Sequence, residues 1–438
     1  MFEREQKGER ALLVQPHVSG RYDRAALEEF TDLARSAGAE VVGVLNARVD
    51  RPNARFLLGS GKVEQVREQK AALDAGLILV NHALTPVQER NLEKLVECRV
   101  LDRTGLILDI FAQRAHSHEG KLQVELAQLK YMATRLVRGW THLERQRGGS
   151  IGLRGPGETQ LETDRRLLAE RVKILGRRLE KVEAQREQAR RSRRRAALPT
   201  VALVGYTNAG KSTLFNSLTG ASVYVADQLF ATLDPTLRRI DGLACGPLLL
   251  ADTVGFVRDL PHDLVAAFRA TLAEARDADL LLHVIDAGDP ECHQRIADVS
   301  AVLAEIGVDD LPQVLVRNKI DCIAGAEPRL DRVNGGEVLQ VSLSARDGRG
   351  LDLLRHAIEQ KLAATRIHAV LQLPSSAARL HARLHEDGLV VAENVGETGW
   401  RVEIDAPRNR IEPLFGLAGG DGEWLEAALA RACEKEAV

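Results

Sequence analysis

The sequence GYTNAGKS, Gly205 to Ser212, is the strongest indicator of fold in this 438-residue chain. It fits G-x-x-x-x-G-K-[ST], a loop whose backbone N–H groups and following helix hold phosphate. Four more motifs follow in order: FATLDPT (230–236), DTVG (252–255), NKID (318–321) and LSA (343–345). The loop alone fits an ATPase, a GTPase or a kinase. The Asp of NKxD favours guanine, whose N1 and N2 donate to a carboxylate that adenine would leave unpaired. The series therefore predicts a GTP-binding domain.

Each motif has a predicted role. Backbone N–H groups from Asn208 to Thr213 wrap the phosphates, and Lys211 reaches the β and γ oxygens. The hydroxyls of Ser212 and Thr232 are placed to ligate Mg²⁺, and Asp252 holds it through water. Gly255 offers its N–H to the γ-phosphate, which makes this segment sensitive to hydrolysis. The predicted catalytic residues are Asn208, Lys211, Thr232 and Gly255.

The remaining motifs read the base. Asn318 ties the loops together, Lys319 packs along the base, and Asp321 reads guanine; Ser344 and Ala345 contact O6 through their backbone. The full set of predicted GTP-binding residues is Gly205, Tyr206, Thr207, Asn208, Ala209, Gly210, Lys211, Ser212, Thr213, Phe230, Ala231, Thr232, Leu233, Asp234, Asp252, Thr253, Val254, Gly255, Asn318, Lys319, Ile320, Asp321, Leu343, Ser344 and Ala345.

Three positions bear on turnover. Phe256 follows DTVG, where Ras-type proteins place a water-orienting glutamine, so intrinsic hydrolysis should be slow and await a partner. In several GTPases with G-x-x-N-x-G-K-S loops the asparagine, here Asn208, helps to bind K⁺; the alternative is a loop-stabilising hydrogen bond. Thr236 competes with Thr232 as the second Mg²⁺ ligand, and Pro235 beside Thr236 favours Thr232.

Composition bounds the rest of the molecule. The hydrophobic fraction of 45% and the charged fraction of 28% are typical of globular protein. The amino terminus is too polar for a signal peptide, and the longest apolar runs are too short to cross a bilayer. Five cysteines without a C-x-x-C pair indicate reduced thiols and argue against a zinc site. We expect a cytoplasmic monomer without a membrane-spanning segment.

Residues 1–115 predict a small α/β domain. Apolar runs at 11–14, 41–45 and 77–80 alternate with amphipathic stretches at 24–37, 63–75 and 85–98, which implies a parallel sheet. GSGK at 59–62 lacks the leading glycine and the final Ser or Thr of a phosphate loop. It is interpreted as a helix start, with an anion site as the alternative.

Residues 116–198 predict a basic antiparallel helical hairpin. Leu122 to Trp140 and Leu161 to Val182 each carry an apolar stripe, and a glycine-rich loop, 144–160, joins them. Residues 121–198 hold 20 Lys and Arg against 9 Asp and Glu, a local +11 that leaves −13 for the remainder of a chain of net charge −2. This asymmetry favours nucleic acid over a merely solvated helix face. The predicted RNA contacts are Arg145, Arg147 and Arg154.

Residues 199–365 predict the P-loop G domain, a doubly wound parallel sheet with strands at 201–205, 248–252, 280–286, 313–318 and 339–343. Residues 366–438 predict a small α+β appendage, with strands at 390–392 and 400–404 and no readable motif. The predicted fold class is therefore α/β: a small parallel α/β domain, a helical hairpin and a P-loop G domain, followed by a small α+β appendage.

The motifs FATLDPT (230–236), ADTVGFVRDLPHDLVAAFRATL (251–272) and GPGETQLETDRR (155–166) resemble those of the HflX family of ribosome-associated GTPases, in the Obg-like branch. Aligning FATL with the FTTL of Obg-like proteins places Thr232 at the switch-one metal position. The resemblance covers nearly the whole chain; the last ~70 residues are the part that varies most within the family.

The resemblance implies binding of the large (50S) ribosomal subunit and its rRNA in the GTP form, and separation of stalled ribosomes under stress. The partners would be GTP, GDP and the ribosome. The cofactor would be Mg²⁺, joined by K⁺ in the case where Asn208 binds that ion instead of making a loop-stabilising hydrogen bond. A large-subunit assembly GTPase is one alternative. Another is an RNA-binding module whose GTP site sets affinity with little turnover.

Overall fold

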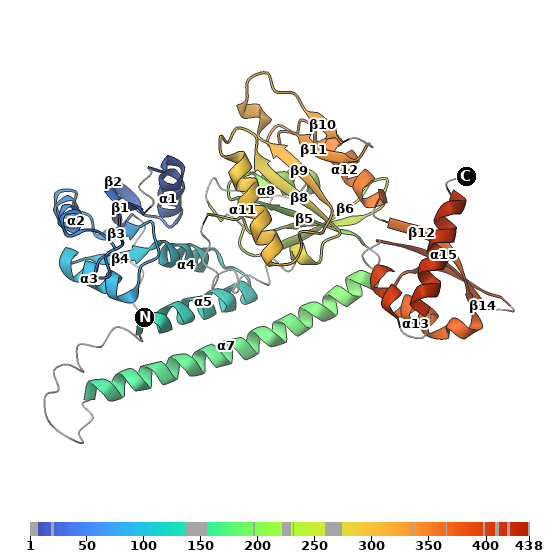
Figure 1. Cartoon of the computed structure of the whole chain (residues 1–438), viewed down its shortest axis with the longest axis horizontal. Helices are drawn as coiled ribbons and strands as arrows, with labels where there is room; N and C mark the ends of the chain where they lie inside the picture. Colours follow the sequence, from blue (N-terminus) through green and yellow to red (C-terminus); the bar gives the residue numbers. More distant parts are fainter. Residues whose placement is uncertain are drawn as a thin grey trace. The chain divides into compact units, whose positions relative to one another are not determined.

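Figure 1 shows the computed structural model of the chain. It describes residues 8–18, 22–136, 156–195, 198–220, 229–230, 232–258, 274–333, 336–364, 366–396, 399–407, 411–417 and 421–436. These form two compact units. One holds the described parts of 1–182, 226–234 and 257–269, and the other holds the described remainder. Among the helices described, none is both long and apolar enough to span a bilayer.

The amino-terminal domain is a four-stranded sheet of order β2-β1-β3-β4, parallel throughout. Its strands are β1 (Arg10–His17), β2 (Glu40–Arg48), β3 (Leu77–Val80) and β4 (Arg99–Asp102). The parallel sheet expected from the β/α alternation is confirmed. β4 was not predicted, because its four residues, RVLD, contain only two apolar residues between two charged ones and form no apolar run.

Helices cover both faces of this sheet (Figure 1). Alternate strand residues such as Leu12 and Ile78 pack with α2 (Ser60–Ala72) and α3 (Pro86–Val96). The opposite face carries α1 (Arg24–Ser36) and α4 (Arg103–Arg114), whose apolar residues are buried. GSGK lies at the start of α2, as the helix-start interpretation expects.

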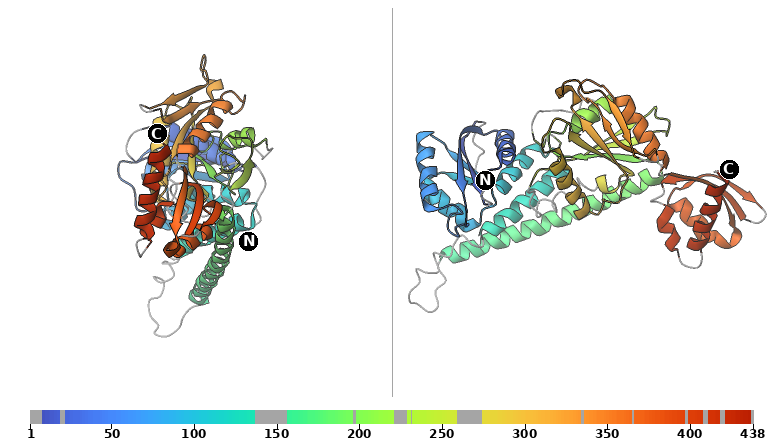
Figure 2. Two further views of the ribbon diagram at one scale, coloured as in Figure 1. Left: turned by 90° about the vertical axis from the view of Figure 1, so that its right-hand side faces the viewer. Right: turned by 45° about the horizontal axis from the view of Figure 1, so that its top comes forward.

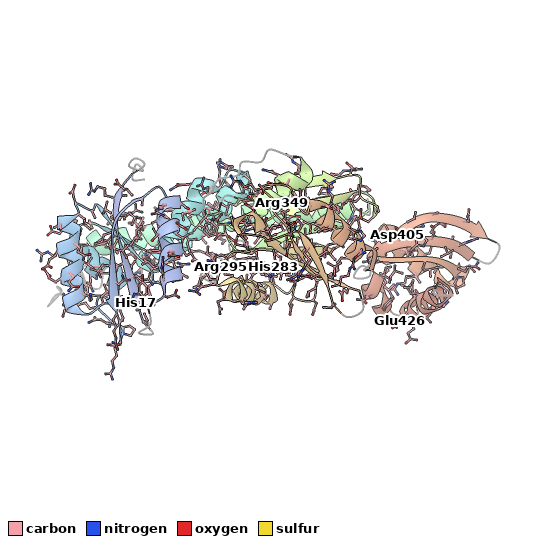
Figure 3. All side chains as sticks on the ribbon, turned by 90° about the horizontal axis from the view of Figure 1, so that it is seen from above. His17, His283, Arg295, Arg349, Asp405 and Glu426 are labelled. Carbon is pink, nitrogen blue, oxygen red and sulfur yellow. The ribbon has the colours of Figure 1, made fainter. Side chains whose placement is uncertain are left out.

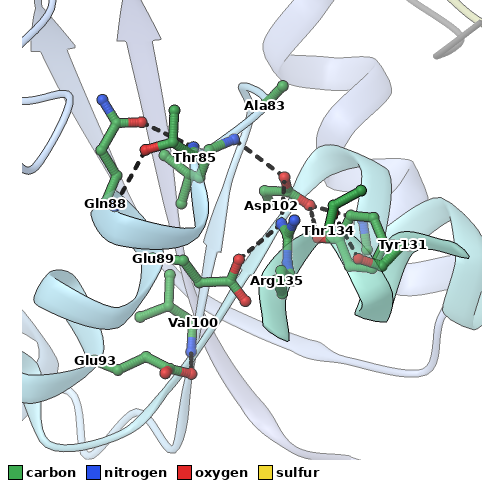
Figure 4. A network of polar contacts seen from close by, with 12 residues as sticks. Ala83, Thr85, Gln88, Glu89, Glu93, Val100, Asp102, Tyr131, Thr134 and Arg135 are labelled. Atoms are coloured by element: carbon green, nitrogen blue, oxygen red, sulfur yellow. Dashed lines mark hydrogen bonds and ion pairs between the residues drawn. The ribbon is translucent and has the colours of Figure 1, made fainter. Parts of the chain in front are cut away.

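A buried polar network fixes α5 (His118–Leu136) to this domain (Figure 4). Asp102, fully buried at the end of β4, accepts from the hydroxyl of Tyr131 at 2.6 Å and from the guanidinium of Arg135 at 3.0 Å. Arg135 also pairs with Glu89 of α3 at 2.7 Å. Burial raises the pKa of Glu89 to about 7, against the opposing charge of Arg135. Removing one member of such a network would leave buried charge uncompensated.

α5 and the first part of α7 (Pro156–Arg195) lie side by side and run antiparallel (Figures 1 and 2). The guanidinium of Arg171 contacts the Glu125 carboxylate at 2.8 and 2.5 Å. In α7 the predicted stripe Leu168, Val172, Leu175, Leu179 and Val182 is its least exposed face. The antiparallel hairpin is therefore present; Arg145, Arg147 and Arg154 lie outside the described residues.

The second unit contains a seven-stranded sheet of order β10-β11-β9-β8-β5-β7-β6. Five strands are parallel: β5 (Thr200–Gly205), β7 (Leu248–Asp252), β8 (Leu280–Asp286), β9 (Gln313–Asn318) and β11 (Val338–Ser342). The five predicted strands are parallel, as expected. Two antiparallel edge strands that were not predicted, β6 (Thr236–Ile240) and β10 (Arg329–Arg332), complete the sheet. Their sequences, TLRRI and RLDR, carry the charges typical of edges.

Helices lie on both sides of this sheet. α8 (Lys211–Thr219) and α12 (Leu351–Ala364) bury Phe215, Ile358 and their neighbours against one face. α11 (Cys292–Glu305) covers the other, with Val299 and Leu303 fully buried. The switch from β5 to α8 positions GYTNAGKS at the carboxyl edge of the sheet, where doubly wound folds bind ligands.

The carboxy-terminal residues form an antiparallel sheet of order β12-β14-β13. Its strands are β12 (Arg366–Pro374), β13 (Val390–Gly396) and β14 (Gly399–Pro407), and α13 (Ala378–Glu386) and α15 (Asp421–Glu436) pack with them. The α+β class expected here is confirmed, and β12 adds a strand that was not predicted.

Candidate functional site

The phosphate loop is shaped by two glycines. Gly205 ends β5 with a φ of +147°, and a Cβ there would lie 2.2 Å from the carbonyl oxygen of Val284. Gly210, at a φ of +91°, precedes α8, and a Cβ there would meet the side-chain amide of Asn318 at 2.2 Å. Neither position tolerates a side chain, so the motif glycines are required by close approach.

Lys211, the first residue of α8, lies inside the loop. Its ammonium donates to the carbonyl oxygens of Gly205 at 3.1 Å and Tyr206 at 2.7 Å. Burial lowers the pKa of Lys211 to about 8, and the charge of Asp252 opposes that shift. A cation held in this way is placed for the phosphates that the loop motif predicts.

Ser212 and Asp252 bring two oxygen ligands together. The Ser212 hydroxyl donates to Oδ2 of Asp252 at 2.8 Å, and Asp252 is fully buried at the end of β7. Hydroxyl and carboxylate oxygens are ligands that Mg²⁺ prefers, so the donor set fits that ion. The neighbouring Thr253 hydroxyl bonds the Leu203 carbonyl at 2.6 Å, which holds β7 beside β5 at this level.

The residues after β7 run beside the phosphate loop. Phe256 accepts from the Thr207 N–H at 2.7 Å and donates its own N–H to Gly205 at 3.1 Å. A Cβ on Gly255 would lie 2.7 Å from Thr207 and 2.9 Å from the Lys211 ammonium. The Phe256 side chain is buried. Gly255 therefore lies in close contact with the phosphate loop.

The motifs that were predicted to read the base are joined by hydrogen bonds of Asn318. Its side-chain amide donates to the Ala209 carbonyl at 2.9 Å, and its oxygen accepts from the Ala345 N–H at 2.9 Å. The Ser344 hydroxyl donates to Asp321 at 2.7 Å and holds the pKa of that carboxyl below its usual range. Asp321 thus stays ionised, as an acceptor for guanine must. The Lys319 ammonium pairs with Asp286 at 2.9 Å.

FATLDPT divides between the two units. Phe230, Thr232, Leu233 and Asp234 belong to the first unit, and Ala231 lies outside the described residues. The Phe230 ring packs edge-on to Phe111 of α4 at a centroid distance of 4.5 Å. Both carboxylate oxygens of Asp234, a residue predicted to contact GTP, accept hydrogen bonds from residues at the start of α5.

Two neighbours of the loop were not predicted. His283 of β8 is buried, and its burial and the Lys211 charge lower its pKa to about 4. Arg295 of α11 lies over the Tyr206 ring at 4.6 Å and pairs with Asp289 at 2.6 Å; Figure 3 labels both His283 and Arg295. The sequence could have indicated His283, because it is a histidine inside the apolar run LLLHVID. It could not have indicated Arg295, because a charged residue on a helix face is usually solvated.

Three family models match consecutive parts of the chain. They are "GTP-binding GTPase N-terminal" at residues 24–112, "GTP-binding GTPase Middle Region" at 114–193 and "50S ribosome-binding GTPase" at 200–319. Among solved structures, a GTP-binding protein from Sulfolobus solfataricus in complex with GDP is 27% identical. The match covers 81% of this chain and 98% of that one with a TM-score of 0.43.

Curated relatives cover most of the chain. GTPase HflX of Escherichia coli strain K12 is 55% identical over 399 residues, 91% of this chain and 93% of its own. GTPase HflX of Magnetococcus marinus is 46% identical over 401 residues, 91% and 92% of the two chains. With the phosphate loop, the Ser212–Asp252 pair and the Asn318 junction, these matches show that the chain belongs to the HflX family of GTPases.

Proposed function

We propose that this GTPase binds the large ribosomal subunit through rRNA and separates stalled ribosomes into subunits under stress. The G-domain family model is described as a 50S ribosome-binding GTPase, which supports a large-subunit partner. The net charge of +11 over residues 121–198 supports contact with RNA. A ribosomal partner also places the protein in the cytoplasm.

The site residues support a Mg²⁺-dependent hydrolysis. Ser212, Thr232 and, through water, Asp252 would hold Mg²⁺, which when bound offsets charge on the β and γ oxygens. Lys211 and the loop N–H groups hold the phosphates, and Gly255 is placed to sense the γ position. Asn208 would contribute to a K⁺ site. Because Phe256 is buried and cannot orient water, the rate-raising group would come from the ribosome.

One observation carries the proposal. The two segments predicted to contact the γ-phosphate, FATLDPT and DTVG, each adjoin residues that bond to the amino-terminal domain. On the FATLDPT side, the Leu229 N–H donates to the Ser36 hydroxyl of α1 at 3.0 Å, and Phe230 packs on Phe111. On the DTVG side, the Arg258 guanidinium pairs with Asp23 at 2.7 Å, and its carbonyl accepts from Arg103 at 2.7 Å.

The described parts of both segments, 226–234 and 257–269, thus belong to the same compact unit as the amino-terminal domain and α5. In GTPases such segments are ordered by the γ-phosphate and released on hydrolysis. A change in them would therefore reach α1, α4 and α5 directly, and through α5 the hairpin. The GTP form would thus be distinguished from the GDP form at the surface proposed to bind RNA.

The test is GTP hydrolysis with and without large ribosomal subunits. Wild type should turn over slowly alone and faster with subunits. Asp23→Asn keeps the helix cap, because asparagine caps as well as aspartate, but removes the charge that faces Arg258. It should lower the stimulated rate and spare the basal rate, whereas Asp32→Asn on the exposed face of α1 should change neither. Equal wild-type rates with and without subunits would contradict the proposal.

A further inference from the structure

The carboxy-terminal domain brings together two histidines and a glutamate. His381 and His385 lie one turn apart on α13, so both rings project from the same face of the helix. Glu393 comes from β13, and its carboxylate lies between the rings. Oε1 is 2.9 Å from Nε2 of His381, and Oε2 is 2.7 Å from Nε2 of His385. One ligand atom from each of the three residues lies within 4.8 Å of the other two.

Neighbouring aromatic contacts hold the rings in place. His381 stacks on Trp400 of β14 with a centroid distance of 4.3 Å and an interplanar angle of 14°. The two imidazoles meet edge to face at 4.7 Å. Trp400 is paired in register with Val395, two residues beyond Glu393 on β13. The helix and both strands therefore position the three polar groups before any ligand arrives, which lowers the cost of binding one.

This arrangement has the chemistry of a transition-metal site. Two imidazole nitrogens and one carboxylate oxygen, with a fourth position for water, form a common ligand set for zinc. Tetrahedral Zn²⁺ with bonds of about 2.0–2.2 Å separates its ligand atoms by roughly 3.4 Å. The observed separations, 2.9 Å from His381 to Oε1 and 2.7 Å from His385 to Oε2, are shorter than this by about 0.5 and 0.7 Å, which small side-chain rotations supply. His385 has 44% of its side chain exposed, which leaves a path for an ion from solvent.

We propose that His381, His385 and Glu393 form a binding site for a divalent transition metal of the zinc class, joining α13 to β13. The cysteine pattern that argues against a zinc site bears only on thiolate ligands, and these ligands are nitrogen and oxygen. Imidazole selects zinc-class ions over Mg²⁺, so this site and the oxygen site at Ser212 take different metals. The competing account is that Glu393 only accepts hydrogen bonds from two histidines, with no affinity for metal.

The experiment is a Zn²⁺ titration of the full-length protein against a chromophoric chelator. The protein is first stripped with EDTA and then supplied with excess Mg²⁺ and GDP, so that the phosphate site is filled. Wild type should bind one tight equivalent of Zn²⁺ that Mg²⁺ does not displace. Co²⁺ in its place should give the strong visible absorption of tetrahedral coordination.

Variants show which residues bind this Zn²⁺ ion. His385→Ala should lower the Zn²⁺ affinity at least about tenfold, since losing even an outer-shell partner of a metal ligand lowers affinity by that much. Glu393→Gln, which keeps the shape of the side chain, should also weaken it. His368→Ala is the matched control, because His368 also pairs with a glutamate, Glu403, at 3.0 Å in the same domain but lies outside the three-residue cluster. Its Zn²⁺ affinity should equal that of wild type.

Unchanged GDP affinity and circular dichroism would show that the variants are folded. The proposal fails if wild type binds no tight equivalent. It also fails if His385→Ala and Glu393→Gln both bind Zn²⁺ as tightly as His368→Ala does.

Discussion

The carboxylate of Asp234 binds Ser117, the residue whose hydroxyl caps the helix α5. Oδ2 accepts the backbone N–H groups of His116 at 2.9 Å and Ser117 at 2.7 Å, and Oδ1 accepts the Ser117 hydroxyl. The same hydroxyl oxygen accepts the Gly120 N–H at 2.8 Å, within the first turn. A carboxylate is stabilised at this end of a helix by the helix dipole. The FATLDPT motif is thereby fastened to the first helix of the hairpin.

Ser117→Ala should destabilise the amino-terminal unit, because it removes the helix cap and one of the bonds to Asp234. Loss of a capping hydroxyl costs about 0.5–2 kcal/mol, measurable by urea denaturation. The control is Thr134→Ala, near the other end of α5, whose hydroxyl is exposed and bonds only locally. If the two variants are equally stable, the contact contributes nothing to folding.

Asp321→Asn should exchange the base preference of the site. The amide presents a donor to the 2-oxo group of xanthine and loses a charged acceptor for guanine. The loss is about 1.5–3 kcal/mol, so GTP affinity should fall roughly ten- to a hundred-fold while xanthosine triphosphate binds better. Competition binding measures both. The control is Asp331→Asn, on edge strand β10, which should leave the preference for GTP unchanged. If Asp321→Asn also keeps the preference for GTP, Asp321 does not read the base.

Lys211 should make nucleotide binding depend on pH. Burial lowers its pKa to about 8 from 10.5 in the unfolded chain. Between these values the unfolded chain holds more protons than the folded one, so this group makes stability rise with pH from about 8 to 10.5. Phosphates favour the charged lysine, so GDP binding at pH 8.5 should take up protons.

Calorimetry in buffers of different ionisation enthalpy counts those protons. At pH 6.5 Lys211 is already charged, and its contribution to proton uptake should vanish, which provides the internal control. The same uptake at both pH values would show that another group titrates.

Asn208 should make hydrolysis depend on K⁺. Replacing KCl by NaCl at constant ionic strength should lower the rate of phosphate release, because the loop asparagine is predicted to help hold K⁺ beside the phosphates. Asn208→Ala should abolish the difference between the two salts. Wild-type rates that are equal in KCl and NaCl would leave Asn208 as a loop-stabilising residue, whose backbone already adopts a φ of +60°.

The arginines of the hairpin loop should set the salt dependence of ribosome binding. Replacing Arg145, Arg147 and Arg154 with alanine should flatten the plot of log affinity against log salt by about 2, at roughly 0.7–0.9 per phosphate contact. GTP binding in the absence of ribosomes should not change. The control replaces three exposed, ion-paired arginines of the G domain: Arg239, Arg329 and Arg349. An equal effect of both triple variants would contradict a specific role for the loop.

The sequence predicted the elements whose signal is local. Phosphate-loop spacing located β5 and α8, and apolar runs located the parallel strands other than β4, because buried strands are continuous in sequence. The short edge strands β6 and β10 were missed, since TLRRI and RLDR are charged and take their structure from a neighbour. Whether a charged segment forms an edge strand depends on the strand beside it more than on its own β-propensity.

Contacts between distant residues could not be predicted from one chain. Asp234 lies 117 residues beyond Ser117, and no pattern links the two. The same holds for Asp102 with Tyr131 and for Glu393 with His381, which meet only because separate elements pack together. Each is a polar side chain whose partner comes from a different element, and the folded structure supplies that partner.

The most direct test of the account is sucrose-gradient sedimentation of intact ribosomes with the protein and a non-hydrolysable GTP analogue. If the protein separates ribosomes, the ribosome peak should give way to free subunits, with the protein on the large one and no such change with GDP. An intact ribosome peak, with the protein bound only to large subunits that were already free, would contradict ribosome separation and favour an assembly role.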